Sequence, residues 1–143
     1  WSLLAEDAAV EDWTAGLSEP KRLSLPPLRW AAEALARRLL RAVPATSQHE
    51  TVGILLDGGA ELIVGMCAAV RVGRPFLLLD PSLPLDRLRF QLDDALASTV
   101  LHAPSVDSGP VGAGLLTMHV NIDQLVDEAT EASASSTAPE GGT

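Results

Sequence analysis

The residues best placed to hold a phosphate are Asp57-Gly58-Gly59, which lie between a short apolar run and a helical pattern. In doubly wound folds, phosphates bind at such turns, against the N-terminus of the following helix. The spacing matches neither the dinucleotide fingerprint nor the P-loop, which carries a lysine before its last residue. The single lysine, Lys21, lies far upstream. A tight turn is therefore the favoured interpretation, and phosphate binding is the lesser alternative.

Histidines and carboxylates are the other groups that could do chemistry. His49, His102 and His119 are scattered, and no two have the helical spacing of metal ligands. His102 and His119 each close an expected strand, so they could approach each other in space, although strand-end histidines without a role are commoner. Adjacent acids such as Asp93-Asp94 point apart on a helix and make poor acid–base pairs. The sequence therefore predicts no catalytic, metal or cofactor-binding residue.

Composition excludes several classes of protein. Apolar residues make up 47% of the 143 residues and the mean hydropathy is +0.20, which favours a folded core. No apolar run approaches the roughly 18 to 20 residues that a membrane span needs. The lone cysteine, Cys67, excludes an internal disulfide and is expected to be a buried small hydrophobe. Together these features indicate a cytoplasmic setting and no membrane partner.

The charge of the chain is unevenly distributed. The formal net charge is −9; residues 1–89 hold 11 acids and all 10 bases, and residues 90–143 hold 8 acids and no base. An acidic half of this kind repels phosphate backbones. We therefore expect no nucleic-acid partner, and a solvated acidic C-terminal part is the simplest interpretation.

Strand and helix patterns alternate through the middle of the chain. Solidly apolar strands are typical of parallel sheets that are covered on both faces. Strands that alternate with helices predict an α/β fold, in which parallel βαβ layers form one sheet. The expected strands are residues 51–56, 76–79, 98–102 and 115–120, and the expected helices are residues 28–43, 60–72 and 84–96.

Two further expectations concern burial. The helix at residues 60–72 is apolar on nearly every side, so it should be covered on most faces. Leu55 and Leu78 should both be buried, because the strands that carry them should lie side by side in the sheet.

The two ends of the chain lack this pattern. Residues 1–22 show no clean periodicity beyond a short possible helix at residues 3–13, and the proline-rich stretch that follows is expected to be linker and loop. From Glu128 onward the residues are small, polar and acidic. We expect residues 128–143 to be a disordered tail.

The segment from Gly53 to Leu101 resembles the early core of adenylation domains in nonribosomal peptide synthetases, which belong to the AMP-forming ligase superfamily. The shared pattern is a buried helix that ends in glycine, an aromatic-led strand, Asp-Pro, a further proline, and Arg-Leu in the next helix. The residues that carry it here are Val72-Gly73, Phe76 to Leu79, Asp80-Pro81, Pro84 and Arg87-Leu88. The resemblance implies architectural roles for Gly73, Asp80, Pro81, Pro84 and Arg87.

The resemblance also divides the chain. Residues 1–22 resemble the linker between a condensation domain and an adenylation domain, and residues 23–127 resemble a truncated adenylation core. Residues 23–28, Leu-Ser-Leu-Pro-Pro-Leu, stand where the family has Leu-Thr-Tyr-x-Glu-Leu, so the tyrosine and the glutamate of that signature are lost.

In the family, the phosphate loop ending in Pro-Lys-Gly and the later residues contact ATP, magnesium and the carboxylic acid, and that loop does not occur in this sequence. The resemblance therefore implies no cofactor and no activity for this chain alone, although ATP and magnesium serve the full-length family. It implies a structural role, with a condensation domain, a carrier domain or a second copy as partner. The alternative is a small flavodoxin-like nucleotide-binding domain that is unrelated to the family.

Overall fold

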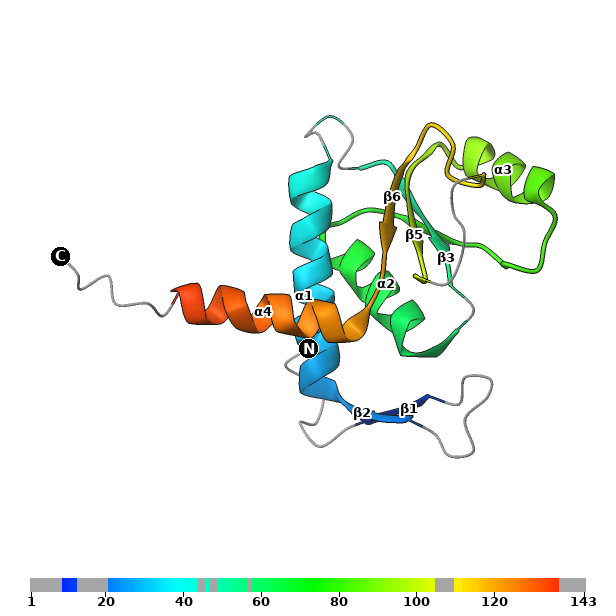
Figure 1. Cartoon of the computed structure of the whole chain (residues 1–143). Coiled ribbons are helices and arrows are strands. Elements are labelled where there is room, and N and C mark those ends of the chain that lie inside the picture. The colour runs from blue at the N-terminus through cyan, green and yellow to red at the C-terminus, as the bar shows by residue number, and fades with distance from the viewer. Residues whose placement is uncertain are drawn as a thin grey trace.

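A four-stranded parallel sheet forms the centre of the molecule (Figure 1). The computed structural model describes residues 9–12, 21–43, 46, 49–56, 58–104 and 110–136. The strand order is β4-β3-β5-β6, so the predicted parallel α/β fold is confirmed. In chain order the elements are β1 (Ala9–Asp12), β2 (Lys21–Ser24), α1 (Leu25–Ala42), β3 (Thr51–Leu55), α2 (Gly59–Arg71), β4 (Phe76–Leu78), α3 (Leu85–Asp94), β5 (Ala97–His102), β6 (Leu116–His119) and α4 (Ile122–Ser136).

Helices cover both faces of this sheet. On one face, Val52, Ile54 and Leu101 pack in a core with residues of α1, α2 and α4. On the other face, Leu55 and Val100 pack with residues of α3. Successive side chains of a strand point to opposite faces, so both sets of strand residues are buried. This arrangement is the physical reason for the solidly apolar strands.

A leucine side chain of α3 lies directly over Gly53 in the strand β3. A Cβ atom added to Gly53 would lie 2.6 Å from Cδ2 of Leu92 and 3.3 Å from Cδ1 of Leu79. Only a residue without a side chain leaves that space to the two leucines. Gly53 therefore allows the α3 face of the sheet to pack tightly.

The helix α1 begins three residues before the predicted start at Leu28. Pro26 and Pro27 occupy its first turn, where a missing backbone N–H costs nothing because the first N–H groups have no partner within the helix. The prolines thus open the helix. Its predicted apolar face is confirmed, since all of its members are buried: Leu28, Ala32, Leu35, Ala36, Leu39 and Val43.

The helix α2 is less covered than its composition predicts. Its buried residues lie on one face, toward the sheet and α1: Ala60, Val64, Gly65, Ala68 and Ala69. Met66 and Cys67 are half-buried, and Val70 is 66% exposed. The expectation of cover on most faces is therefore confirmed only in part: Leu62, Met66 and Cys67 pack partly buried against the core, whereas Val70 is open to solvent.

A buried arginine holds the amino ends of three strands together. Arg74 is 3% exposed. Its Nε donates to the carbonyl of Glu50 at 2.7 Å, before β3, and its Nη2 donates to the hydroxyls of Ser98 and Thr99 in β5 at 2.8 and 3.1 Å. Burial lowers the pKa of this guanidinium, and the charge of Glu50 acts in the opposite direction. The planar fork of arginine suits several acceptors at once.

The last helix, α4, replaces part of the expected tail. It runs to Ser136, so the prediction of disorder is wrong for residues 128–136; residues 137–143 lie outside the described residues. Asn121 caps it, accepting a hydrogen bond from the backbone N–H of Gln124 at 3.2 Å. The apolar positions Ile122, Leu125 and Ala129 are buried against α1, at a spacing that the sequence shows but that we had not assigned to a helix.

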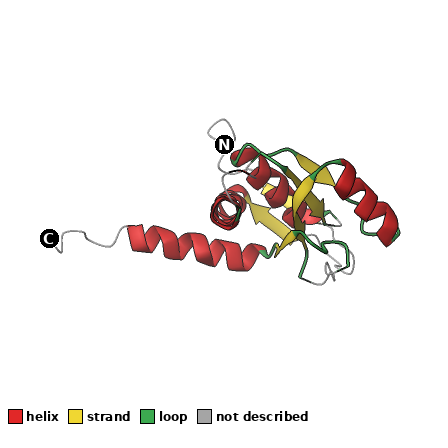
Figure 2. Ribbon diagram, turned by 90° about the horizontal axis from the view of Figure 1, so that it is seen from above, coloured by secondary structure: helices red, strands yellow, loops and turns green. Residues whose placement is uncertain are grey.

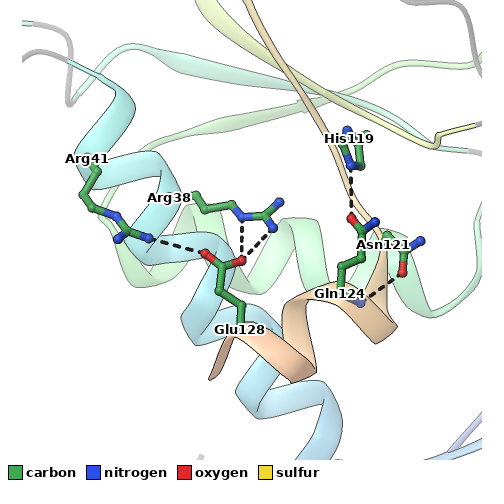
Figure 3. Close-up of polar contacts among 6 residues, drawn as sticks. All are labelled: Arg38, Arg41, His119, Asn121, Gln124 and Glu128. Atoms are coloured by element: carbon green, nitrogen blue, oxygen red, sulfur yellow. Dashed lines mark hydrogen bonds and ion pairs between the residues drawn. The ribbon is translucent and has the colours of Figure 1, made fainter. Parts of the chain in front are cut away.

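Charged side chains fasten α4 to α1 (Figure 3). Arg38 contacts Oε2 of Glu128 twice, through Nε at 2.7 Å and through Nη2 at 2.6 Å, and Arg41 reaches Oε1 at 3.4 Å. The residues beyond Ala129 extend away from the rest of the fold (Figure 2). The Glu128 contact therefore lies near the outer limit of the packed part of α4.

The N-terminal part contains a separate two-stranded sheet. β1 pairs antiparallel with β2, with Ala9 opposite Ser24 and Asp12 opposite Lys21. The short helix expected at residues 3–13 is wrong for residues 9–12, which form β1; residues 1–8 and 13–20 lie outside the described residues. Lys21 to Ser24 are likewise strand where loop was expected. The role of residues 1–22 as a linker stays a prediction.

β4 is an edge strand, and this corrects one expected burial. Leu55 is 1% exposed, as predicted, but Leu78 is 51% exposed and Phe76 is 37% exposed. β4 pairs only with β3 in the described part of the chain, and its side chains on the α2 side extend beyond the cover that α2 provides. Strand pairing alone did not bury Leu78.

Aspartate substitutions should distinguish these two leucines. Leu55→Asp places an unpaired charge in an apolar interior, which costs several kcal/mol, comparable to a domain's stability of about 5–15 kcal/mol. We expect this variant to lose its cooperative unfolding transition in circular dichroism. Leu78→Asp serves as the matched control and should keep the transition, with a shift within about 1 kcal/mol. Unfolding of the Leu78→Asp variant would contradict the exposed position of this side chain.

Candidate functional site

The glycine turn before α2 has the geometry of a tight turn. Gly58 and Gly59 have φ angles of 91° and 78°, values that favour glycine, and α2 begins at Gly59 without a side-chain cap. Asp57 lies outside the described residues. The conformation explains the glycines without a ligand, so the turn alone identifies no phosphate site.

Gly73 ends α2, as predicted. Its φ is 76°, and its N–H donates to the carbonyl of Val70 at 3.0 Å. The next N–H, of Arg74, donates to the carbonyl of Ala69 at 2.9 Å. These two bonds form a Schellman motif, which needs a left-handed residue at this position. Gly73 thus directs the chain from α2 into β4.

Asp80 organises the loop that leaves β4 at its other end. Its Oδ1 accepts hydrogen bonds from the hydroxyl of Ser82 at 2.7 Å and from the backbone N–H of Ser82 at 2.9 Å. The hydroxyl bond, followed by the backbone bond, holds the pKa of Asp80 below its ordinary value. The N–H of Leu83 also donates to the Asp80 carbonyl at 3.1 Å. The loop is therefore a hydrogen-bonded turn set by one aspartate.

Pro84 and Arg87 lie at the start of α3. Pro84 is the residue before the first helical one, and its carbonyl accepts from the N–H groups of Arg87 and Leu88 at 3.0 and 3.1 Å. The guanidinium carbon of Arg87 lies 5.8 Å from the centre of the Phe90 ring, within cation–π range. Both residues have architectural contacts. Gly73 lies at the opposite end of β4 from Asp80 and Pro81, so the five motif residues do not form one site.

An apolar pocket of about 270 Å³ lies beside the Asp80 turn. Leu55, the last residue of β3, lies in its wall, and open α/β sheets bind ligands beyond the carboxyl ends of their strands. Among the described residues, no charged side chain lines it. The sequence did not indicate this pocket, because its walls come from separate segments: Leu55, Pro81, Leu83, Leu85, Leu88, Pro110 and Val111.

Two of the three histidines do come together. The ring centres of His102 and His119 are 6.4 Å apart, edge to face, at the ends of the neighbouring strands β5 and β6. His119 Nε2 lies 3.2 Å from Oε1 of Gln124 (Figure 3), and His102 Nδ1 lies 2.8 Å from the carbonyl of Ala103. Among the described residues, no group of three or more histidine, cysteine or acidic residues could hold a metal. His49 is not part of this pair.

The remaining candidate residue, Cys67, lies half-buried on α2. Burial raises the pKa of its thiol above the ordinary value. A raised pKa disfavours the reactive thiolate. Cys67 packs as a small apolar residue, as expected, but it is half-buried and not fully buried.

Comparison with known proteins identifies the fold and its family. The family model of AMP-binding enzymes matches residues 5–141. The chain belongs to the AMP-binding enzyme family. The resemblance to the adenylation domains of the AMP-forming ligase superfamily is thereby confirmed, and the unrelated flavodoxin-like alternative is not favoured.

The similar members of the family are much larger proteins. Surfactin synthase subunit 2 of Bacillus subtilis is 39% identical over 88 residues, which is 62% of this chain and 2% of the synthase. The AMB antimetabolite synthetase AmbB of Pseudomonas aeruginosa is 35% identical over 115 residues, which is 79% of this chain and 9% of the synthetase. The chain therefore spans a small part of each of these family members.

Solved family structures share the fold. An O-succinylbenzoate coenzyme A synthetase of Bacillus subtilis, in complex with AMP, has a TM-score of 0.68 at 20% identity, over 88% of this chain and 31% of that chain. The N-terminal subdomain of NpsA from Klebsiella oxytoca has a TM-score of 0.60 at 18% identity, over 75% of this chain and 26% of that chain.

In the described part of this chain, no helix is long and apolar enough to cross a membrane.

The Asp80 turn can be tested by titration. Ser82→Ala removes the hydroxyl donor and keeps the backbone donor, so the pKa of Asp80 should rise toward its ordinary value. A depressed pKa contributes stability above the unfolded-state pKa, and that stability is lost as the pH falls through the folded-state pKa. Because Asp80 is exposed, we expect the change mainly in the carboxyl chemical shift measured by NMR. Ser82→Thr keeps the hydroxyl and should leave the pKa low; an equal rise in both variants would contradict this assignment.

Proposed function

We propose that this chain is the opening segment of a nonribosomal-peptide-synthetase type adenylation domain. In the complete domain, ATP activates an amino acid or another carboxylic acid as an acyl-adenylate. The observation that carries the proposal is the family match over residues 5–141, together with the similarity to surfactin synthase subunit 2. The geometry of Gly73, Asp80 and Pro84, which direct the chain around β4, supports it, because these are the architectural positions that the resemblance implies.

These 143 residues would have no adenylating activity alone. In adenylation domains of the AMP-forming ligase superfamily, the groups that contact ATP, magnesium and the carboxylic acid follow the region that corresponds to β6 and α4. Phosphoryl chemistry needs positioned cations and hydrogen-bond donors at the developing charge. The one lysine, Lys21, lies in β2, and the pocket beside Asp80 is lined by apolar side chains. A structural contribution to a larger domain is the role that these features support.

An exchange assay tests the inactivity. The isolated chain should show no acid-dependent exchange of pyrophosphate into ATP above the buffer background, because its residues offer no phosphate cradle. A complete adenylation domain of known substrate, assayed beside it, provides the positive control. Exchange by a chain of verified mass, with any amino or aryl acid, would contradict the proposal.

The segment would also need a partner surface. Large apolar side chains remain exposed on β4 and on α3, with exposed fractions of 37% for Phe76, 51% for Leu78, 38% for Leu85 and 58% for Phe90. A row of unpaired backbone groups at a sheet edge is a template for another strand. Phe76 and Leu78, which are exposed on the edge strand β4, therefore favour an interface there. The partner would be a neighbouring synthetase domain, such as a condensation or carrier domain, or a second copy of this chain.

Light scattering tests this need for cover. The purified chain should bind a hydrophobic dye and associate increasingly as its concentration rises, because Phe76 and Leu78 lie open at the edge. A double variant, Phe76→Ser with Leu78→Ser, should reduce both signals while it keeps the folded circular dichroism spectrum. A stable monomer that binds no dye would contradict the partner surface.

A further inference from the structure

A groove between α1 and the end of α2 combines apolar and cationic side chains. Its volume is about 260 Å³. Ala36 and Leu40 line it from α1, and Val72 lines it from the end of α2. Leu40 is 47% exposed, so this apolar lining is open to solvent. The groove lies on the face of the sheet that α1 and α2 cover, away from the Asp80 turn.

Two arginines in this groove have no ion-pair partner among the residues that the structure describes. Arg37 from α1 and Arg71 from α2 both line it and are exposed, and neither forms an ion pair or hydrogen bond with another described residue. The third charged residue of the lining, Glu33, lies 3.6 Å from Arg29 and is paired within α1. The groove therefore carries uncompensated positive charge on a chain whose formal net charge is −9.

An aromatic side chain extends the same face of α1. Trp30 is 47% exposed and lies at helical spacing from Glu33, Arg37 and Leu40, so these four positions form one stripe along the helix. Tryptophan and arginine are the residue types most enriched where protein interfaces concentrate their binding energy. Trp30 and Leu40 lie at the two ends of this stripe, and the guanidinium of Arg37 lies between them. Such a surface suits a ligand that alternates apolar and acidic groups.

We propose that this groove, lined by Arg37, Leu40, Arg71 and Val72, binds an acidic amphipathic peptide segment of a partner protein, together with Trp30 farther along the exposed face of α1. Carboxylates of the segment would pair with the two guanidiniums, whose planar forks match carboxylate geometry. Apolar side chains of the same segment would cover Trp30 and Leu40, as in the helix-in-groove mode of recognition. The charge of the groove selects an acidic partner over a basic one. This interaction does not depend on adenylating activity in the parent protein.

Binding of a designed peptide tests the proposal on the full chain. The probe is a fluorescein-labelled amphipathic peptide with leucine on one helical face and glutamate on the other, followed by fluorescence anisotropy. We expect saturable binding that weakens as salt is raised, because exposed charge pairs are screened. The matched peptide with lysine in place of glutamate should bind at least about tenfold more weakly, since like charges oppose it.

Charge reversal at the groove provides the deciding comparison. Arg37→Glu with Arg71→Glu should lower the affinity for the acidic peptide by about tenfold or more, and should raise the affinity for the lysine peptide. Arg89→Glu on α3 makes a single charge reversal outside the groove, and should leave the affinity within about twofold. Both sites are exposed, so circular dichroism should confirm an unchanged fold. Equal binding by the groove variant and the control would overturn the proposal.

Further measurements separate other occupants from the proposed one. Trp30→Ala should weaken binding of the acidic peptide, because the apolar contact is lost; unchanged affinity would overturn the amphipathic assignment. A peptide of glutamate and serine that binds as tightly, or displacement by micromolar inorganic pyrophosphate, would identify a simple anion site instead. Self-association that Arg37→Glu with Arg71→Glu abolishes, while the Phe76→Ser and Leu78→Ser variant retains it, would identify a second copy as the occupant.

Discussion

Burial of β3 on both of its faces is the constraint on which the rest of the structure depends. Val52 and Ile54 face the core shared by α1, α2 and α4, while Leu55 faces the core of α3. Gly53 leaves room for Leu92 of α3 on that second face. The pairing of β3 with both β4 and β5 then sets the crossovers, since each parallel connection must pass a helix over the sheet. Loss of this strand would therefore uncouple both cores at once.

The helix α1 connects this sheet to the C-terminal part of the molecule. One side of it packs on α2 and the sheet, and Arg38 and Arg41 hold Glu128 of α4. The same helix exposes the stripe that contains Trp30 and Arg37. The alanines and leucines of α1 thus pack in the interior, while its outer face is the surface that we propose binds a partner. Arg38 and Arg41 pair with Glu128, whereas Arg37 and Arg71 carry the positive charge of the groove.

The structural contribution that we propose for this chain agrees with the local geometry around β4. The motif residues shape the two ends of β4, and Arg74 ties the amino ends of the strands through Glu50, Ser98 and Thr99. The solved structures that share this fold extend well beyond the matched region, since this chain covers 31% of the chain of the AMP-bound synthetase. A rigid α/β layer with open apolar positions at one edge suits addition to a larger structure.

Local sequence determined much of this architecture: apolar strands bounded by Asp-Gly and Asp-Pro turns, a helix closed by Gly73, and the order of elements along the chain. These features depend on the backbone preferences of a few neighbouring residues, and so they can be derived without long-range contacts. Only the tertiary structure decided that β4 lies at an edge with Leu78 exposed, that Arg74 is buried, and that α4 docks through Glu128. The spacing of Ile122, Leu125 and Ala129 could have indicated α4, but no local pattern places Arg38 beside Glu128. Periodicity reports which side of an element is apolar, whereas strand order and helix docking decide what, if anything, covers that side.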